Sequence, residues 1–389
     1  MSDLGGKTAI AGIGATEFSK NSGRSELQLA VEAVSAALAD AGIEPREVDG
    51  LVTFTMDNNI EVEVARGIGA GDLAFFSRPH YGGGGGSGGV LHAALAVAAG
   101  VSDVCVVYRA MNERSQYRFG QPMGGALPPT SEYTGLTYHG LHGVTTAAAY
   151  IALGMRRYMH ETGATELDFA NLAVNSRGFA ATNPAAFFYG KPITVEDHLA
   201  SRMIADPFRL LDCCQESDGA VAVVVVSAER AKSLKQKPAI IRAASQSAPA
   251  GQMNLTSYYR DNIAPYDEVA FSARQLYAMA RMTPADISMA NIYDHFAPTI
   301  LPSLEGLGFC ARGEAKDFIK GGTIGIDGRL PLNTNGGQVG EAYIHGMNGI
   351  AEAVRQIRGT AVNQVKDVAN IIVTSGSAVP TSGLILGAA

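Results

Sequence analysis

The chain has 389 residues, of which 47% are apolar and 17% are charged, and its formal net charge is −7. This apolar content is enough for large hydrophobic cores and excludes disorder as the main state of the chain. The charged fraction is well below the average of about 25% for soluble proteins, which indicates that much of the surface is buried in contacts with other molecules. The acidic balance and the lack of a basic run argue against a nucleic-acid partner.

The cysteines and the N-terminus indicate where the protein resides. Four cysteines in a chain of this length, with Cys213 and Cys214 adjacent and no CxxC pair, do not form a disulfide framework. The N-terminus has no basic stretch leading into an apolar one, so we expect no signal peptide. No run of about 18 apolar residues occurs, so we expect no membrane span. These features predict a reduced, cytoplasmic location.

The first elements follow a strand–helix–strand order. The apolar run at Thr8–Ile13 predicts a strand, and the capping-box pattern Ser25-Glu26-Leu27-Gln28 predicts a helix that ends near Gly42. A second strand is expected at Leu51–Phe54. This order is typical of a layered α/β fold.

The same passage recurs later in the chain. A helix is expected over Asp267–Met282 and a strand over Ala290–Tyr293. The prolines that precede the two strands, Pro45 and Pro284, are 239 positions apart. We therefore expect an internal repeat.

Two continuous apolar strands, Ala220–Val226 and Asn370–Val373, suit a sheet that is covered on both faces. Together with the repeat, they predict two related α/β halves, residues 1–235 and 236–389. The segment from about 112 to 192 has no counterpart in the second half and is expected to be an inserted loop domain with a helix at Thr145–Met159.

Two motifs are more easily explained by structure than by chemistry. The run Ala9–Gly14 resembles a dinucleotide-binding turn, but Glu17 occupies the position of the third glycine, where a carboxylate would repel a pyrophosphate. His139 and His142 could ligate a metal, yet no further ligand follows at a zinc-like spacing, so we expect no metal site.

A run of glycines from Gly82 to Gly89 is interrupted only by Ser87 and leads into an apolar helix expected over Val90–Ala99. Glycine has a high conformational entropy cost on folding, so such a run needs a reason. It could present backbone donors to a ligand at a helix N-terminus, or it could remove side chains to make room.

The sequence resembles the thiolase superfamily, in particular its sterol-carrier and lipid-transfer-protein branch, over nearly the whole chain. The resemblance is carried by Ala11–Phe18, by the Ser217–Ala220 turn and by the order of four active-site loops. These loops contain Ser87-Gly88, Tyr293-Asp294-His295-Phe296, Gly336-Gly337 followed by Tyr343-Ile344-His345-Gly346, and Thr374-Ser375-Gly376. The resemblance implies the thiolase fold, an α/β fold of two related layered α-β-α halves with mixed sheets and an inserted loop domain.

The thiolase catalytic residues are absent from their positions. Alignment on Ser87-Gly88 places Gly85 at the position of the nucleophilic cysteine, and Tyr343 stands where thiolases carry a histidine. Thiolysis and Claisen condensation pass through an acyl-enzyme, which requires a thiolate and a base. Thiolase activity is therefore not expected from these positions. The backbone N–H groups of Gly85 and Gly376 can still form an oxyanion hole for a thioester carbonyl.

Tyr293 and Tyr343 occupy the positions of the thiolase asparagine and histidine. A phenol with a pKa of about 10 is a poor base but can shuttle a proton if a donor or a positive charge lowers that pKa. His295 and His345 are close in sequence and are the candidates for lowering it, and Asp294 is a further supporting residue. The alternative is a pair of buried core tyrosines with satisfied hydroxyls.

This pattern is similar to that of the steroid side-chain-cleaving aldolases of the superfamily, which lack the catalytic cysteine. The resemblance implies retro-aldol cleavage of a bulky β-hydroxyacyl-CoA, a 17-hydroxy steroid 22-oyl-CoA, into a 17-keto steroid and propionyl-CoA. We expect Tyr343 to take the hydroxyl proton and Tyr293 to protonate the α-carbon, or the reverse. The glycine run would then vacate volume for the ring system.

The resemblance also implies the partners. The CoA thioester would be the substrate, and no cofactor is expected. We expect a homodimer, formed through the N-terminal half as in thiolases, and a complex with a small protein of the zinc-ribbon and OB-fold type. Two alternatives stay open: a thiolase or acyltransferase that uses a displaced cysteine, Cys213 or Cys310, and a non-catalytic scaffold that binds acyl-CoA or lipid.

Overall fold

The computed structural model describes residues 4–80, 82–116, 118, 137–253, 255–376 and 381–389. Its main sheet is built from β1 (Thr8–Ala15), β2 (Gly50–Val52), β3 (Phe75–Ser77), β4 (Cys105–Asn112), β7 (Asp218–Ser227), β8 (Ala239–Ser247), β9 (Met289–Asn291), β10 (Asn370–Ser375) and β11 (Thr381–Gly387). The order is β3-β2-β4-β7-β1-β8-β11-β10-β9, with both parallel and antiparallel pairs. A short hairpin pairs β5 (Met203–Ala205) with β6 (Phe208–Arg209).

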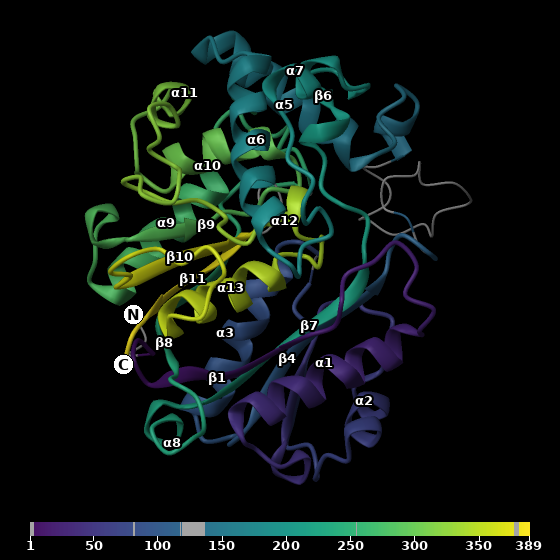
Figure 1. The fold of residues 1–389 in the computed structure, drawn as a ribbon, viewed down its shortest axis with the longest axis vertical. Helices are drawn as coiled ribbons and strands as arrows, with labels where there is room; N and C mark the ends of the chain where they lie inside the picture. Colours follow the sequence, from purple (N-terminus) through teal and green to yellow (C-terminus); the bar gives the residue numbers. More distant parts are fainter. Residues whose placement is uncertain (1–3, 81, 117, 119–136, 254, 377–380) are drawn as a thin grey trace.

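Helices cover this sheet in layers. They are α1 (Glu26–Ala41), α2 (Glu61–Ile68), α3 (Gly85–Ala98), α5 (Ala147–Thr162), α6 (Glu166–Thr182), α7 (Val195–Ala200), α8 (Ala228–Ala231), α9 (Asp267–Ala280), α10 (Ile300–Gly306), α11 (Ala315–Phe318), α12 (Gly337–Gly340) and α13 (Met347–Arg358). α1 covers the strands of the first half and α9 those of the second, while α3 and α13 lie between them (Figure 1). The fold is the mixed, layered α/β arrangement that the sequence predicts.

The first predicted elements are confirmed. β1 covers the expected strand, and α1 begins after Ser25, whose hydroxyl accepts from the Gln28 backbone N–H at 3.1 Å. The reciprocal half of the capping box differs, because the Gln28 side chain donates to Glu32 instead. Gly42 ends the helix in the left-handed conformation, at φ 72°.

The internal repeat is visible in the structure. A 3₁₀ turn at Pro45–Glu47 leads into β2, and a second at Pro284–Asp286 leads into β9. β2 pairs in parallel with β4, and β9 pairs in parallel with β10. The related passages therefore fold alike, while the division of the chain into domains at residue 235 stays a prediction.

The helix after the glycine run begins earlier than expected. α3 starts at Gly85 rather than at Val90, so the later glycines of the run are helical. This central helix packs closely on its neighbours: a Cβ at Gly88 would lie 3.1 Å from the Gln246 side chain, and one at Gly89 would lie 2.9 Å from Val107. Contact with neighbours on both sides, rather than helix propensity, therefore accounts for these glycines.

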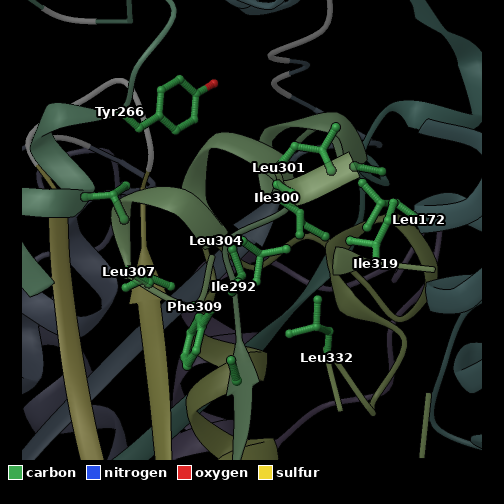
Figure 2. Close-up of a cluster of buried hydrophobic side chains, with 14 of the residues drawn as sticks. Leu172, Tyr266, Ile292, Ile300, Leu301, Leu304, Leu307, Phe309, Ile319 and Leu332 are labelled. Atoms are coloured by element: carbon green, nitrogen blue, oxygen red, sulfur yellow. The ribbon is translucent and has the colours of Figure 1, made fainter. Parts of the chain in front are cut away.

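The inserted segment packs on the second half. The helix expected at Thr145–Met159 is α5, and α6 and α7 follow it. Leu172 of α6 lies beside Ile300, Leu301 and Ile319 in one buried hydrophobic cluster (Figure 2). The proline- and glycine-rich residues 120–122 and 128–129 of this segment lie outside the described residues.

Within the part of the chain that the structure describes, none of the helices has the length and apolar character needed to span a membrane. The cytoplasmic location expected from the cysteines stays a prediction.

The contact between β1 and α1 yields a stability prediction. A Cβ at Gly14 would overlap the Ala33 carbonyl oxygen of α1, so Gly14→Ala should lower the free energy of unfolding by about 1 to 3 kcal/mol through overpacking. Chemical denaturation of the purified variant measures this. Gly178→Ala is the matched control, because Gly178 lies on the exposed side of α6 with open space around it. It should stabilise the protein by up to about 1 kcal/mol, and an equal loss in both variants would contradict the packing argument.

Candidate active site

The four loops that the sequence singled out meet at the N-terminus of α3. The Ser87 and Ser375 hydroxyls are 2.8 Å apart, which joins the first loop to the fourth. The Tyr293 backbone N–H donates to the Thr374 hydroxyl at 3.0 Å and joins the second to the fourth. The Gln338 backbone N–H donates to Asp294 at 2.8 Å and joins the third to the second. Segments far apart in the sequence thus form one site between the two halves of the sheet.

The predicted tyrosines are in direct contact. Tyr293 follows β9, Tyr343 lies between α12 and α13, and their hydroxyl oxygens are 2.9 Å apart. The residues are only 4% and 9% exposed and pack against Met111 and Cys214. A hydrogen bond between two buried hydroxyls is a path along which a proton can move. The sequence placed both residues in the site, and the structure adds the contact between them.

The electrostatics of the pair differ from the expectation. Burial raises the pKa of both tyrosines well above the usual 10.0. Burial also lowers the pKa of His295 to about 3 and that of His345 well below its usual value. Both imidazoles are therefore neutral near pH 7 and supply no positive charge, so the expected lowering of the tyrosine pKa values by these histidines is not found. The physical reason is desolvation, which disfavours every charged form in this site.

The space cleared by the first glycines is filled by the protein itself. A Cβ at Gly83 would overlap the Tyr293 hydroxyl, one at Gly82 would lie 3.0 Å from the His345 ring, and one at Gly85 would lie 2.9 Å from the Phe54 ring. The expectation that these glycines vacate volume for a ring system is therefore corrected. They allow site side chains to approach the backbone at the start of α3.

The two predicted oxyanion-hole residues lie at the same end of α3. The Gly85 N–H donates to the Gly82 carbonyl at 2.9 Å, so in this structure it has an acceptor within the turn. Gly376 is buried, directly follows Ser375 and has φ 75°. Ser375 in turn accepts from the Ser87 N–H at 3.0 Å. The oxyanion-hole role of both glycines stays a proposal.

A buried ion pair supports His345, and the sequence analysis missed it. Arg109 of β4 is 2% exposed; it donates to Asp57 at 3.0 Å and to Nδ1 of His345 at 3.1 Å. Because Nδ1 accepts, the proton of the neutral imidazole is on Nε2. The His345 ring lies 5.0 Å from the ring of Tyr343. The available signal was an arginine within an apolar strand, which is rarely buried without a partner.

Asp294 and His295 order the second loop. Asp294 is held by the Gln338 N–H and packs against Gly337, and burial raises its pKa to about 6. The His295 ring lies 5.1 Å from that of Tyr293, and its carbonyl accepts from the Cys214 N–H at 2.9 Å. These contacts fix the backbone that carries Tyr293.

The cysteines are poor nucleophiles in this environment. Burial raises the pKa of Cys213 and of Cys310 to about 12, and that of Cys214 well above its usual value. Cys214 is the one that contacts the tyrosine pair. Since the thiolate is the reactive form, none of these three is activated for acyl transfer.

The described residues contain no group of three His, Cys, Asp or Glu side chains that could hold a metal ion.

Comparisons with known proteins identify the family of the chain. The family model "Thiolase, N-terminal domain" matches residues 8–229, and "Thiolase C-terminal domain-like" matches residues 251–387. The chain belongs to the thiolase family. The solved structure "Crystal structure of a monomeric SCP2-thiolase like protein type 1 (STLP1) from Mycobacterium smegmatis" shares the fold at a TM-score of 0.74 and 22% identity, covering 98% of this chain and 77% of that one.

Within the thiolase family, the similarity extends to named enzymes. The chain is 59% identical over 386 residues to "17-hydroxy-3-oxo-4-pregnene-20-carboxyl-CoA lyase" of Mycobacterium tuberculosis, covering 99% of this chain and 100% of that protein. It is 59% identical to "Steroid side-chain-cleaving aldolase" of Thermomonospora curvata, with both chains covered fully. The solved structure "Ltp2-ChsH2(DUF35) aldolase" superposes at a TM-score of 0.95 with 58% identity over 100% of this chain and 99% of that one.

The buried ion pair predicts a large stability effect. Asp57→Asn leaves the Arg109 charge buried without its partner, and should lower the free energy of unfolding by about 3 to 5 kcal/mol. Thermal and denaturant unfolding measure the loss. Glu229→Gln breaks the exposed pair with Lys232 and is the control, with an expected change below about 1 kcal/mol. A loss for Asp57→Asn as small as that of the control would show that Arg109 does not depend on this carboxylate.

Proposed function

We propose that this protein is a carbon–carbon lyase that cleaves a steroid side-chain acyl-CoA by a retro-aldol reaction. The observation that carries the proposal is the hydrogen bond between the hydroxyls of Tyr293 and Tyr343, which are 2.9 Å apart. These tyrosines stand at the positions of the thiolase asparagine and histidine, and Gly85 stands at that of the nucleophilic cysteine. Of the two relatives at 59% identity, one is named as a lyase of a pregnene carboxyl-CoA and the other as an aldolase that cleaves a steroid side chain. The proposed substrate is a 17-hydroxy steroid 22-oyl-CoA, and the products are a 17-keto steroid and propionyl-CoA.

The tyrosine pair can move a proton without becoming charged. The substrate hydroxyl gives its proton to Tyr343, the proton of Tyr343 passes to Tyr293, and that of Tyr293 passes to the α-carbon. The bond between the carbinol carbon and the α-carbon breaks, and its electron pair forms the enolate that accepts the proton. In sum, the substrate hydroxyl loses one proton and the α-carbon gains one, and both tyrosines are again neutral phenols at the end. The raised pKa values of both phenols do not oppose this relay, because no phenolate has to accumulate.

The enolate oxygen needs donors, and the proposed ones are the N–H groups of Gly85 and Gly376. Gly85 opens α3, a helix of 14 residues, whose positive end favours a developing negative charge. The bond from Gly85 to the Gly82 carbonyl would have to open when the thioester binds. Neither donor requires a side chain, and the reaction requires no cofactor beyond the CoA that the substrate carries.

The position of β3 supports the proposed homodimer. β3 is an edge strand of the sheet, so one side of its backbone is open to pairing. Phe76 of β3 is 63% exposed, and Ile60 and Val62 near the start of α2 are 55% and 61% exposed. Arg78, directly after β3, donates to the carbonyls of Asp57 and Asn59, which places that loop beside the strand.

We also propose that the active form includes a second protein, of the small zinc-ribbon and OB-fold type that the sequence resemblance implies. The 58% identical solved structure is named for two components, Ltp2 and ChsH2(DUF35), which supports a partner protein for this chain as well. The assay should therefore be run with and without such a partner.

The phenol relay predicts that Tyr293→Phe and Tyr343→Phe each lower kcat/KM by about 10²- to 10⁴-fold, because one link of the proton path is lost. The measurement is release of ketone and propionyl-CoA from the steroid acyl-CoA, with the partner present. Tyr259→Phe removes a hydroxyl from a residue that is 80% exposed and serves as the control. Full activity of both site variants would eliminate the relay, and an inactive wild type with the partner supplied would eliminate the lyase.

The proposed dimer predicts that Phe76→Asp weakens self-association, because a charge would be buried at the edge of β3. Sedimentation velocity should show a dimer for the wild type and a shift towards monomer for the variant. Val362→Asp, at a residue that is 57% exposed and lies after α13, is the control and should remain a dimer. A monomeric wild type, or an unchanged Phe76→Asp, would contradict this interface.

A further inference from the structure

The proposed relay does not use a buried carboxyl group, that of Glu113, two residues after Met111, which packs against the tyrosine pair. Glu113 directly follows the last residue of β4 and is 3% exposed. Its Oε2 atom has no hydrogen-bond partner among the residues that the structure describes. β4 pairs with β7 as far as Asn112 opposite Asp218, so Glu113 lies just beyond this pair, next to Ser217. The Ser217 hydroxyl accepts from the Tyr343 N–H at 3.3 Å. Glu113 is thus close to the residue that holds the Tyr343 backbone.

The charged and titratable groups that interact electrostatically with Glu113 come from several elements. They are Lys20, Arg109, Arg118, Cys214, Glu216, Tyr293 and Tyr343. Burial is the largest influence and raises the pKa of Glu113 well above its usual value; Glu216 raises it further, while Arg109 and Lys20 lower it. The balance favours the protonated form of the carboxyl group.

None of the three cations is available to pair fully with Glu113. Arg118 donates to the Glu216 carboxylate at 2.8 Å. The Lys20 ammonium donates to the Gln215 side chain at 2.9 Å and to the Glu216 carbonyl at 2.6 Å. Arg109 is paired with Asp57. A buried carboxylate without a full partner is unfavourable, so the protonated form is the one that this geometry accommodates.

The protonated form also suits the chemistry of the site. Cleavage develops negative charge on the thioester oxygen while protons shift through the two phenols. An ionised Glu113 would place a like charge beside them, and a neutral one does not. We propose that Glu113 is a positioning residue that must hold its proton for the reaction to run, and that its ionisation switches the tyrosine relay off. This inference rests on the proposed function.

The test is the pH profile of kcat, from neutral to strongly alkaline pH, for the wild type, Glu113→Gln and Glu216→Gln with the partner supplied. In the wild type, kcat should fall about tenfold per pH unit along an alkaline limb. In Glu113→Gln the limb should be absent over that range, whatever the plateau value of kcat. In Glu216→Gln it should move to lower pH, because the Glu216 charge helps to keep the proton on Glu113.

Three results would overturn the inference. One is a wild type without an alkaline limb, and another is an unchanged limb in Glu113→Gln. The third is a limb that moves to lower pH in Glu113→Gln: the charge of Glu113 raises the pKa of both tyrosines, so that shift would assign the limb to them.

An infrared titration tests the protonation state without substrate. The wild-type minus Glu113→Gln difference spectrum should contain the carbonyl-stretching band of a protonated carboxyl group at neutral pH. The difference isolates Glu113 from other buried acids with a raised pKa, Asp294, Glu341 and Glu352. The band should disappear over the pH range in which kcat falls. If the band is missing, the inference about Glu113 is wrong. The proposed lyase function is tested separately, by the activity assay of the wild type.

Discussion

The hydrogen bond between the hydroxyls of Tyr293 and Tyr343 is the contact on which the candidate site depends. It joins the loop after β9 to the segment between α12 and α13, and it lies at the N-terminus of the central helix α3. Each other part of the site can be understood by how it supports this contact. Gly83 permits Tyr293 to approach the backbone, Asp294 ties the second loop to the third, and Ser375 ties the first to the fourth.

Desolvation is the constraint that sets the chemistry available to this site. Its tyrosines, histidines, thiol and Glu113 are all driven towards their neutral forms by burial. Such a site is unsuited to a thiolate nucleophile, which must be charged to react. It is well suited to a reaction in which protons are passed between neutral groups and the only developing charge belongs to the substrate. Arg109 retains its charge because Asp57 is buried beside it.

Sequence patterns predicted those elements that have a strong local signal. The cap at Ser25, the left-handed Gly42 and the 239-residue repeat all correspond to structure. The strands β4 and β8 were not predicted, because Arg109 interrupts the apolar run of β4 and Arg242 interrupts that of β8. The start of α3 was missed because its glycines respond to neighbours that are distant in sequence, such as Gln246.

In the candidate site, too, local sequence signals were predictive and effects of distant neighbours were not. A motif comparison located Tyr293 and Tyr343, because their positions are defined by the order of the loops. It could not reveal that His295 and His345 are neutral, since burial depends on the packed structure. Nor could it reveal Glu113 or Asp57, which reach the site from segments that carry no motif.

The fit between Gly85 and Phe54 bears on how a chain of this family could change its reaction. A side chain at position 85 would begin 2.9 Å from the Phe54 ring, so a cysteine could be placed there only if that ring shifted. A smaller residue at position 54 would remove this conflict. The packing around Phe54 is therefore an obstacle to regaining the nucleophile, in addition to the replacement of the thiolase histidine by Tyr343.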